Sequence, residues 1–248
     1  MWEGGSLWVT DATAAASRER KHTDLHAHHA IQITFGLGGR FRLKTTDAEM
    51  GGDAVAVAPD VGHIFEAEGL MALLFVEPES RNGRAILAEH FKGAALAAIP
   101  PSFLNDNRAR IAAAFRAPPE TSRADLITLG QDLISRLSSG ARADVPDLRV
   151  RKAAAWAAKQ LDRRIGLTEA AEAVNLSPGR LRHLFVEHTG LPFKTYLLWL
   201  RLTRAVEHFA AGVSLTQAAH DAGFSDSAHL SRTFRRMFGI SPAALRIT

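Results

Sequence analysis

Two stretches near the end of the chain are rich in side chains that donate hydrogen bonds. They span residues 178–189 and 227–238 of the 248-residue sequence. Guanidinium, imidazole and hydroxyl groups bind base edges and phosphates, so these stretches suit the major groove of double-stranded DNA if each forms a helix. The donors are Arg180, Arg182 and His183 in the first stretch, and Ser227, His229, Arg232, Arg235 and Arg236 in the second.

The two stretches occupy equivalent places in an internal repeat. Residues 167–171 (LTEAA) recur 48 positions later as residues 215–219 (LTQAA), and residues 175–177 recur as residues 223–225. A long apolar stretch over residues 193–211 separates the two copies and predicts a central packed helix. We therefore predict two helix-turn-helix motifs joined by a connecting helix.

Local signals support both motifs. Asn175 and Gly223 stand where a tight turn needs a residue that tolerates a positive φ. Ser177 and Ser225 are expected to cap the second helix of each motif. The remaining signals are a capping box from Ser214 and Gln217, the core-facing pairs Leu181/Phe185 and Leu230/Phe234, and the helix terminators Gly190 and Gly239.

The charge of the chain is divided unevenly. Residues 1–147 carry a formal net charge of −4 and residues 148–248 carry +8, within a total of +4. This asymmetry favours a polyanionic partner for the C-terminal part. The absence of cysteine excludes a disulfide framework and a thiol nucleophile. No apolar run approaches the ~18 residues of a membrane-spanning helix, so we expect a cytoplasmic protein without a membrane partner.

The N-terminal part alternates in the manner of short β-strands. Residues 30–35 and 41–44 alternate with glycines between them, which predicts a hairpin, and residues 54–58, 63–66 and 71–76 predict further strands of a small sandwich or barrel. Helices are expected at 84–91, 107–117 and about 121–137. One face of the last helix carries Leu126, Leu129, Leu133 and Leu137, which suits either a homodimer contact or a packing face within the domain.

The C-terminal part resembles the AraC/XylS family of transcriptional regulators over about residues 148–246. The resemblance rests on residues 218–226 (AAHDAGFSD), Phe234, residues 238–239 and residues 241–242. It implies a domain of seven helices with two helix-turn-helix motifs, promoter DNA and RNA polymerase as partners, and a cytoplasmic activator. Mapped onto this sequence, it implies base readers at Gly179, Arg182, His183, Ala228, His229 and Arg232, and phosphate anchors at Arg201, Ser225, Arg235 and Arg236.

Residues 20–80 resemble, more loosely, the cupin-like sensory domain common in that family. The equivalents of the cupin metal ligands are His26, His28, Gln32 and His63, and three neutral imidazoles suit Zn, Ni, Cu or Fe. A cupin-like barrel has an interior that would hold a small organic effector or be filled as a plain core. Its expected lining is Ile31, Ile33, Phe35, Phe41 and Phe65.

The expected fold is therefore a two-domain α+β protein. It has a cupin-like β-barrel with flanking helices over residues 1–140, a linker over 141–147, and an all-α domain with two helix-turn-helix motifs over 148–248. The expected function is that of a non-enzymatic, sequence-specific transcriptional regulator that senses a small molecule or a metal. The alternatives are a cupin-type metalloenzyme fused to a helical domain, or a DNA binder that responds to no effector.

Overall fold

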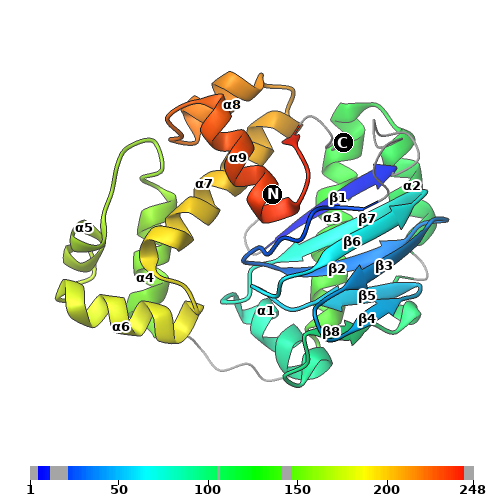
Figure 1. Cartoon of the computed structure of the whole chain (residues 1–248), viewed down its shortest axis with the longest axis horizontal. Helices are drawn as coiled ribbons and strands as arrows, with labels where there is room; N and C mark the ends of the chain where they lie inside the picture. The colour runs from blue at the N-terminus through cyan, green and yellow to red at the C-terminus, as the bar shows by residue number, and fades with distance from the viewer. Residues whose placement is uncertain (1–4, 12–21, 105–106, 141–146, 243–248) are drawn as a thin grey trace. The chain divides into compact units, whose positions relative to one another are not determined.

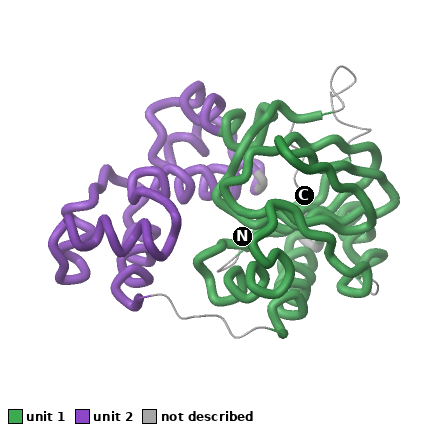
Figure 2. Tube along the Cα trace, turned by 60° about the horizontal axis from the view of Figure 1, so that its bottom comes forward, with its two compact units in different colours: residues 1–143, 234–248 green, residues 144–233 purple. Residues whose placement is uncertain are grey.

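The structure is a computed structural model that describes residues 5–11, 22–104, 107–140 and 147–242. The chain divides into two compact units (Figure 2). The first contains residues 1–143 together with residues 234–248, and the second contains residues 144–233. We predicted residues 148–248 as one domain, whereas the structure groups residues 234–248 with the N-terminal part. Residues 141–146 of the predicted linker lie outside the described residues.

The first unit contains two antiparallel sheets (Figure 1). The larger has the order β1 (Gly5–Asp11), β7 (Leu70–Val76), β2 (Ile31–Gly36), β5 (Ala54–Val57) and β8 (Leu96–Ala98). The smaller has the order β4 (Glu49–Gly51), β3 (Arg40–Lys44) and β6 (Ile64–Glu68). The expected fold class is confirmed, but the described strands form two sheets rather than one closed barrel.

The predicted hairpin of β2 with β3 is wrong. Ile33 on β2 pairs with Ala56 on β5 and Leu74 on β7, whereas β3 pairs with β4 and β6 in the smaller sheet. The chain changes sheets between the two strands. Gly39 lies there against the backbone of the β6–β7 turn, where an added Cβ would meet the Glu68 carbonyl oxygen at 2.4 Å. Gly39 is thus needed because two chain segments approach each other closely, and not because a two-residue hairpin turn requires it.

The larger sheet is covered on one face by helices. These are α1 (Arg81–Ile86), a π-helix over Leu87–Phe91, a 3-10 turn over Pro101–Phe103, α2 (Arg108–Arg116) and α3 (Pro119–Leu137). All four residues of the predicted leucine stripe on α3 are 0–3% exposed, within the core between sheet and helices. The stripe is therefore a packing face within the unit, and it is not available as a dimer contact.

The residues predicted to line an effector pocket lie in two different cores. Ile31, Ile33 and Phe35 lie in the core shared with the helices. Phe41 and Phe65 instead belong to a second cluster with Val55, Val57, Leu43, Met71 and Leu96. The five predicted pocket residues thus line two separate cores, because the three on β2 share the face that packs on the helices, whereas Phe41 and Phe65 belong to the smaller sheet. The prediction of one common pocket for them is wrong.

The helical part follows the internal repeat. Its helices are α4 (Leu148–Ala158), α5 (Leu167–Glu172), α6 (Pro178–Thr189), α7 (Phe193–Ala210), α8 (Leu215–Asp221) and α9 (Ser227–Phe238). The described residues thus hold six helices of this part, where the family resemblance implied seven. The first motif is packed around Phe185, whose ring meets those of Phe193 and Tyr196 edge-on at 5.2 and 5.1 Å between centroids.

Candidate nucleic-acid interface and histidine cluster

The first helix-turn-helix motif, α5 and α6, has the predicted local signals. Asn175 has a φ of 55° in the turn, and the Ser177 hydroxyl accepts a hydrogen bond from the Arg180 backbone N–H at the start of α6. Pro178 occupies the first helical position, where no N–H partner is required. The helix therefore begins at a fixed residue, which fixes the direction in which its side chains project.

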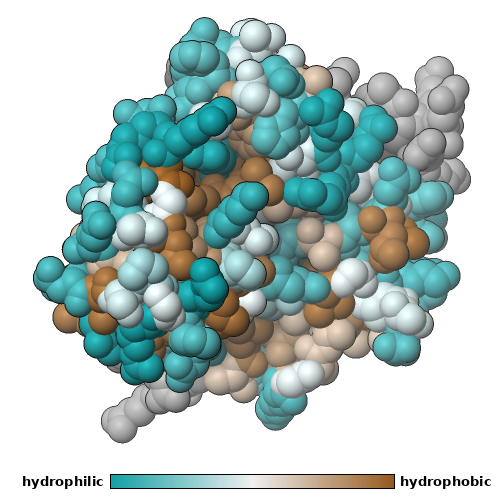
Figure 3. All heavy atoms as spheres, turned by 60° about the vertical axis from the view of Figure 1, so that its left-hand side comes forward, coloured by the Kyte–Doolittle hydropathy of each residue, from teal (hydrophilic) through white to brown (hydrophobic). Residues whose placement is uncertain are grey.

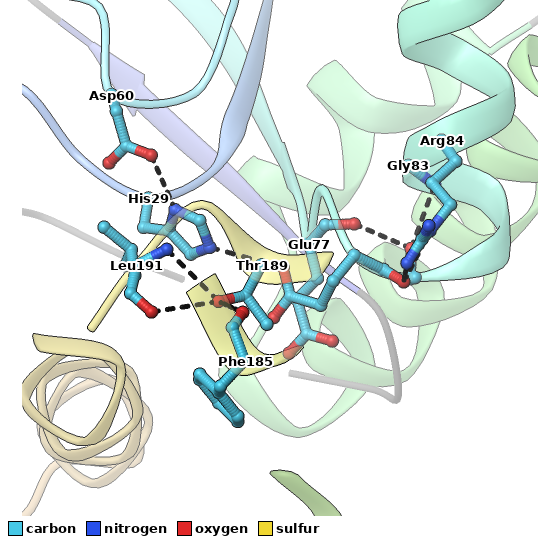
Figure 4. Close-up of polar contacts among 10 residues, drawn as sticks. His29, Asp60, Glu77, Gly83, Arg84, Phe185, Thr189 and Leu191 are labelled. Carbon is cyan, nitrogen blue, oxygen red and sulfur yellow. Dashed lines mark hydrogen bonds and ion pairs between the residues drawn. The ribbon is translucent and has the colours of Figure 1, made fainter. Parts of the chain in front are cut away.

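The far end of α6 is held by Thr189 and Gly190. The Thr189 hydroxyl donates to the Phe185 carbonyl at 2.7 Å and accepts from the Leu191 N–H at 3.2 Å (Figure 4). Gly190 has a φ of 77°, as predicted for a helix terminator. Between its two fixed ends, α6 buries Leu181, Leu184 and Phe185 and leaves the predicted donors Arg180, Arg182 and His183 exposed, with Gly179.

The second motif, α8 and α9, differs from the prediction at its cap. The acceptor at the start of α9 is Asp226, whose carboxylate receives the His229 backbone N–H at 2.6 Å. Ser225 instead donates its hydroxyl hydrogen to Asp226 at 3.1 Å and lies 3.2 Å from Nδ1 of His229. The hydrogen bond from the His229 backbone lowers the pKa of the Asp226 carboxyl. Serine and aspartate are equally good caps, so sequence alone could not choose between two adjacent candidates.

The predicted capping box of α8 forms only in part. The Ser214 hydroxyl accepts from the Gln217 N–H at 3.2 Å, as expected. The Gln217 side chain, however, donates to the Asp221 carboxylate at 2.7 Å instead of returning to the backbone of Ser214. Gly223 has the predicted positive φ, at 76°.

Helix α9 presents one polar face. Ala228, Arg232, Arg235 and Arg236 are exposed, whereas Leu230, Thr233 and Phe234 are buried. Ser227 and His229 are half-buried, and the His229 ring stands edge-on to Phe224 at 5.2 Å. The histidine is thereby held by three neighbouring residues. Hydrophilic side chains cover much of the face of the molecule drawn in Figure 3, with hydrophobic residues between them.

Arg201 does not have the environment expected for a phosphate anchor. It is half-buried, and its guanidinium donates to the Arg163 carbonyl at 3.1 Å. A Cβ on Gly223 would lie 3.1 Å from its Nε, and Nε is buried without a hydrogen-bond partner among the described residues. The side chain therefore braces the turn of the second motif against the connection between α4 and α5.

A second candidate site consists of three histidines in the first unit. His26 and His63 form an isolated β-bridge with backbone hydrogen bonds of 3.1 and 2.8 Å. Their ring centroids are 4.2 Å apart, and His28 lies 5.2 Å from His63 and 5.9 Å from His26. One nitrogen from each of the three rings lies within 4.8 Å of the others. The structure thus brings together the three histidines that the cupin resemblance singled out.

Backbone carbonyl groups determine which ring nitrogen carries the proton in His26 and in His63. Nδ1 of His26 lies 2.9 Å from the Asp24 carbonyl oxygen, and Nδ1 of His63 lies 2.9 Å from that of Val61. A carbonyl only accepts, so each Nδ1 carries the hydrogen and each Nε2 keeps its lone pair. Nε2 of His63 is buried with no hydrogen-bond partner among the described residues. Such an atom is a metal-ligand candidate.

All three rings are neutral at physiological pH. Burial, followed by the neighbouring histidines, lowers the pKa of His26 to about 4 and that of His28 to about 3. Burial also lowers the pKa of His63. Metal ions bind neutral imidazole, so no proton has to be displaced before coordination.

Gln32 is hydrogen-bonded to one histidine of the cluster. Its Oε1 lies 3.0 Å from Nε2 of His28, and its amide nitrogen donates to the Thr34 hydroxyl at 3.1 Å. All three side chains are buried. In this structure Gln32 is a hydrogen-bond partner that orients His28, and its role as a fourth ligand stays a prediction.

His29 lies next in the sequence but in a different electrostatic environment. Its Nδ1 is 2.8 Å from the Asp60 carboxylate (Figure 4), and its Nε2 is 3.4 Å from Glu79. Burial by itself would lower the pKa of His29, but hydrogen bonds to the two carboxylates and their charges raise it to about 9. The ring is thus a buried cation at neutral pH. Sequence reasoning missed this group, because Asp60 and Glu79 are distant in the chain.

The charge on His29 predicts a pH-dependent contribution to stability. Because its folded-state pKa of about 9 lies above the ordinary 6.5, the contribution is complete below pH 6.5 and is lost as the pH rises through 9. The difference in unfolding free energy between wild type and His29→Asn should therefore shrink between pH 6 and pH 9.5, by up to about 3 kcal/mol. Urea unfolding of both proteins at the two pH values measures it, and a constant difference would contradict the assignment.

No helix in the described part of the chain is both long and apolar enough to cross a membrane.

Comparisons with known proteins agree with this organisation. Residues 170–247 match a family model described as a helix-turn-helix domain. The HTH-type transcriptional activator RhaS of Salmonella schwarzengrund is 32% identical over 133 residues, which are 52% of this chain and 47% of RhaS. The transcriptional activator RhrA of Rhizobium meliloti is 34% identical over 83 residues, which are 32% of this chain and 26% of RhrA. The chain thus covers less than half the length of these two relatives.

Solved structures extend the likeness to both units. ToxT from Vibrio cholerae O395 matches with a TM-score of 0.60 at 9% identity, over 96% of this chain and 95% of ToxT. ToxT from strain SCE256 with a bound unsaturated fatty acid matches with a TM-score of 0.56 at 10% identity, over 98% and 95%. At these identities the likeness shows the fold alone.

The sheet-rich unit and the two capped second helices define a helix-turn-helix protein with an N-terminal β domain. The family match and the likeness to RhaS and RhrA specify the class further. Residues 170–247 thus match a helix-turn-helix domain, and the chain is similar to transcriptional activators over part of their length.

Proposed function

We propose that this chain is a sequence-specific DNA-binding regulator of transcription whose N-terminal unit senses an effector. The observation that carries the proposal is the pair of second helices, α6 and α9. Each begins at a side-chain cap, buries one apolar face and exposes arginines on the other. Two such helices in one chain suit two segments of the major groove. RNA polymerase and a second copy of the chain are proposed partners.

The direct test is selection of duplexes from a random pool, followed by binding of the selected duplex at several salt concentrations. We expect one enriched sequence pattern. We also expect a steep salt dependence, because the arginines release counterions from the phosphates; six to ten phosphate contacts correspond to a loss of roughly 10³–10⁵ in affinity between 50 and 200 mM salt. Equal affinity for selected and unselected duplexes would refute sequence specificity and favour an architectural DNA binder.

We further propose that the effector is a divalent transition metal held by His26, His28 and His63. Three neutral, buried imidazoles with converging nitrogens suit Zn, Ni, Cu or Fe, and the orphaned Nε2 of His63 supplies a donor without another partner among the described residues. When bound, the ion would cross-link the segment before β2 to the residue that precedes β6. This proposal is separate from DNA binding, so either can fail alone.

Replacing His63 by alanine should remove the metal site. Loss of even an outer hydrogen-bond partner costs 10–100-fold in metal affinity, so loss of a ligand should cost at least about 100-fold. Calorimetric titration of wild type with Zn²⁺ and Ni²⁺ should give one ion per chain. His22→Ala, which removes an exposed histidine outside the cluster, serves as the matched control and should bind like wild type.

Three outcomes would redirect the effector proposal. Absence of stoichiometric binding by wild type, or equal binding by His63→Ala, would exclude a metal at this cluster. An unsaturated fatty acid that changes DNA affinity where the metal does not would move the effector to the ligand class seen in ToxT. Turnover of an organic substrate by the metal-loaded protein would favour the enzyme alternative.

A further inference from the structure

The residues that end α9 lie on the histidine cluster. Gly239 accepts a hydrogen bond through its carbonyl from the Asp24 N–H at 2.9 Å. A Cβ added to Gly239 would lie 2.5 Å from the Asp24 carbonyl oxygen and 2.7 Å from Nδ1 of His26, and its φ is +68°. Only glycine fits this position, since it needs both a left-handed conformation and direct contact of backbone with the ligand loop.

The ring of Phe238, next in the chain, also packs beside the histidine cluster. Its ring centroid lies 5.2 Å from that of Trp8, 5.7 Å from that of His28 and 5.8 Å from that of Phe75. Phe238 is 6% exposed, and His28 beneath it is 2% exposed. Phe238 and Gly239, here called the closing segment, belong to the same compact unit as the histidines. They form a cover over one side of the cluster.

This cover conflicts with a hydrated metal ion. A site with three protein ligands keeps its fourth position for water or another small ligand. Three neutral imidazoles leave the double positive charge of the ion uncompensated, and burial of such a charge under an apolar ring is costly. A Cβ added to Gly239 would lie 2.7 Å from Nδ1 of His26, so the closing segment also leaves little room for this ring to move.

We propose that the closing segment is a gate, and that metal binding at the cluster and docking of Phe238–Gly239 on it exclude each other. The inference rests on the proposed function, since it concerns the effector site of that regulator. Phe238 is the last residue of α9, the helix that carries Arg232. Because Phe238 and Arg232 lie on the same helix, release of Phe238 directly changes the surroundings of a helix that is proposed to bind DNA bases.

The test measures Zn²⁺ affinity of the full chain by calorimetry. Wild type must open the gate before it binds, so its apparent affinity is the intrinsic affinity multiplied by the open fraction, and a variant with a weakened gate avoids that loss. Phe238→Ala and Gly239→Ala should therefore bind Zn²⁺ at least about fivefold more tightly than wild type. Phe115→Ala removes a half-buried ring from α2, away from the histidines, and should leave the affinity unchanged.

Hydrogen exchange on the wild-type protein gives a readout that does not depend on any variant folding. Saturation with Zn²⁺ should speed amide exchange in the peptide that covers residues 236–240. Slower exchange there, or wild-type affinity in a folded Phe238→Ala or Gly239→Ala protein, would overturn the gate while the metal site stands. Absence of Zn²⁺ binding by every variant would overturn gate and metal site together, whereas the DNA-selection experiment still decides the proposed DNA-binding function.

Discussion

Replacing Arg232 by alanine should reduce discrimination at one base pair of the operator by about 1–3 kcal/mol, which is a loss of roughly 5- to 150-fold in preference. Arg232 is exposed on α9, one helical turn after Ala228, on a helix whose start is fixed by the Asp226 cap. A guanidinium held in this way can bind a guanine edge with two hydrogen bonds. Alanine removes both, and leaves the rest of the interface in place.

The matched control is Arg235→Ala, which removes an exposed arginine of the same helix that is proposed to bind phosphate. It should weaken binding to all duplexes alike and reduce the salt dependence by about one ion. Binding of both variants to the selected duplex and to all single-base variants of it separates the two effects. Uniform weakening by Arg232→Ala would show that Arg232 binds phosphate instead of a base.

Replacing Phe185 by alanine should cost about 3–5 kcal/mol of unfolding free energy and abolish operator binding. The Phe185 side chain is 0% exposed and meets two aromatic rings, so its removal leaves a cavity at the centre of the first motif. The same helix carries Arg180, Arg182 and His183. Loss of its packing would therefore also free these donors from their common orientation.

Two further substitutions, Phe185→Leu and Val186→Ala, serve as comparisons for Phe185→Ala. Phe185→Leu keeps part of the buried volume and should cost less than Phe185→Ala. Val186→Ala alters the adjacent residue, which is 41% exposed, and should change the unfolding free energy by no more than about 0.5 kcal/mol. Denaturant unfolding followed by circular dichroism measures all three. Similar losses for Phe185→Ala and Val186→Ala would contradict the packing described for α6.

The helical part was predictable because its signals are local. The turn at Asn175, the cap at Ser177 and the terminator at Gly190 act within a few residues, and each has the predicted conformation. The repeat then confirmed the pattern from a second copy. Prediction was wrong where two local solutions compete within a few residues, as with the cap of α9, or where a side chain has another partner in reach, as with Gln217.

The sheet unit was less predictable because its contacts are between distant residues. Alternation identified β2 and β3 as strands, but nothing in either strand showed that they belong to different sheets. Strand β1 was not predicted at all. The histidine cluster came from a resemblance and not from spacing. Its contact with Phe238 joins residues 210 positions apart in the chain, beyond the reach of any periodicity argument.

The opposite environments of His28 and His29 have a consequence for how the chain tolerates change. The pKa of His28 is lowered to about 3 and that of His29 is raised to about 9, although the two residues are adjacent and identical. Two adjacent histidines thus differ in charge at neutral pH: His28 is neutral and His29 is a buried cation. Deleting Ala30, which separates His29 from the start of β2, would move His28 toward the place of His29 and Ala27 toward that of His28. Both the histidine cluster and the ion pairs of His29 would then be disturbed, so the length of this segment is constrained as well as its composition.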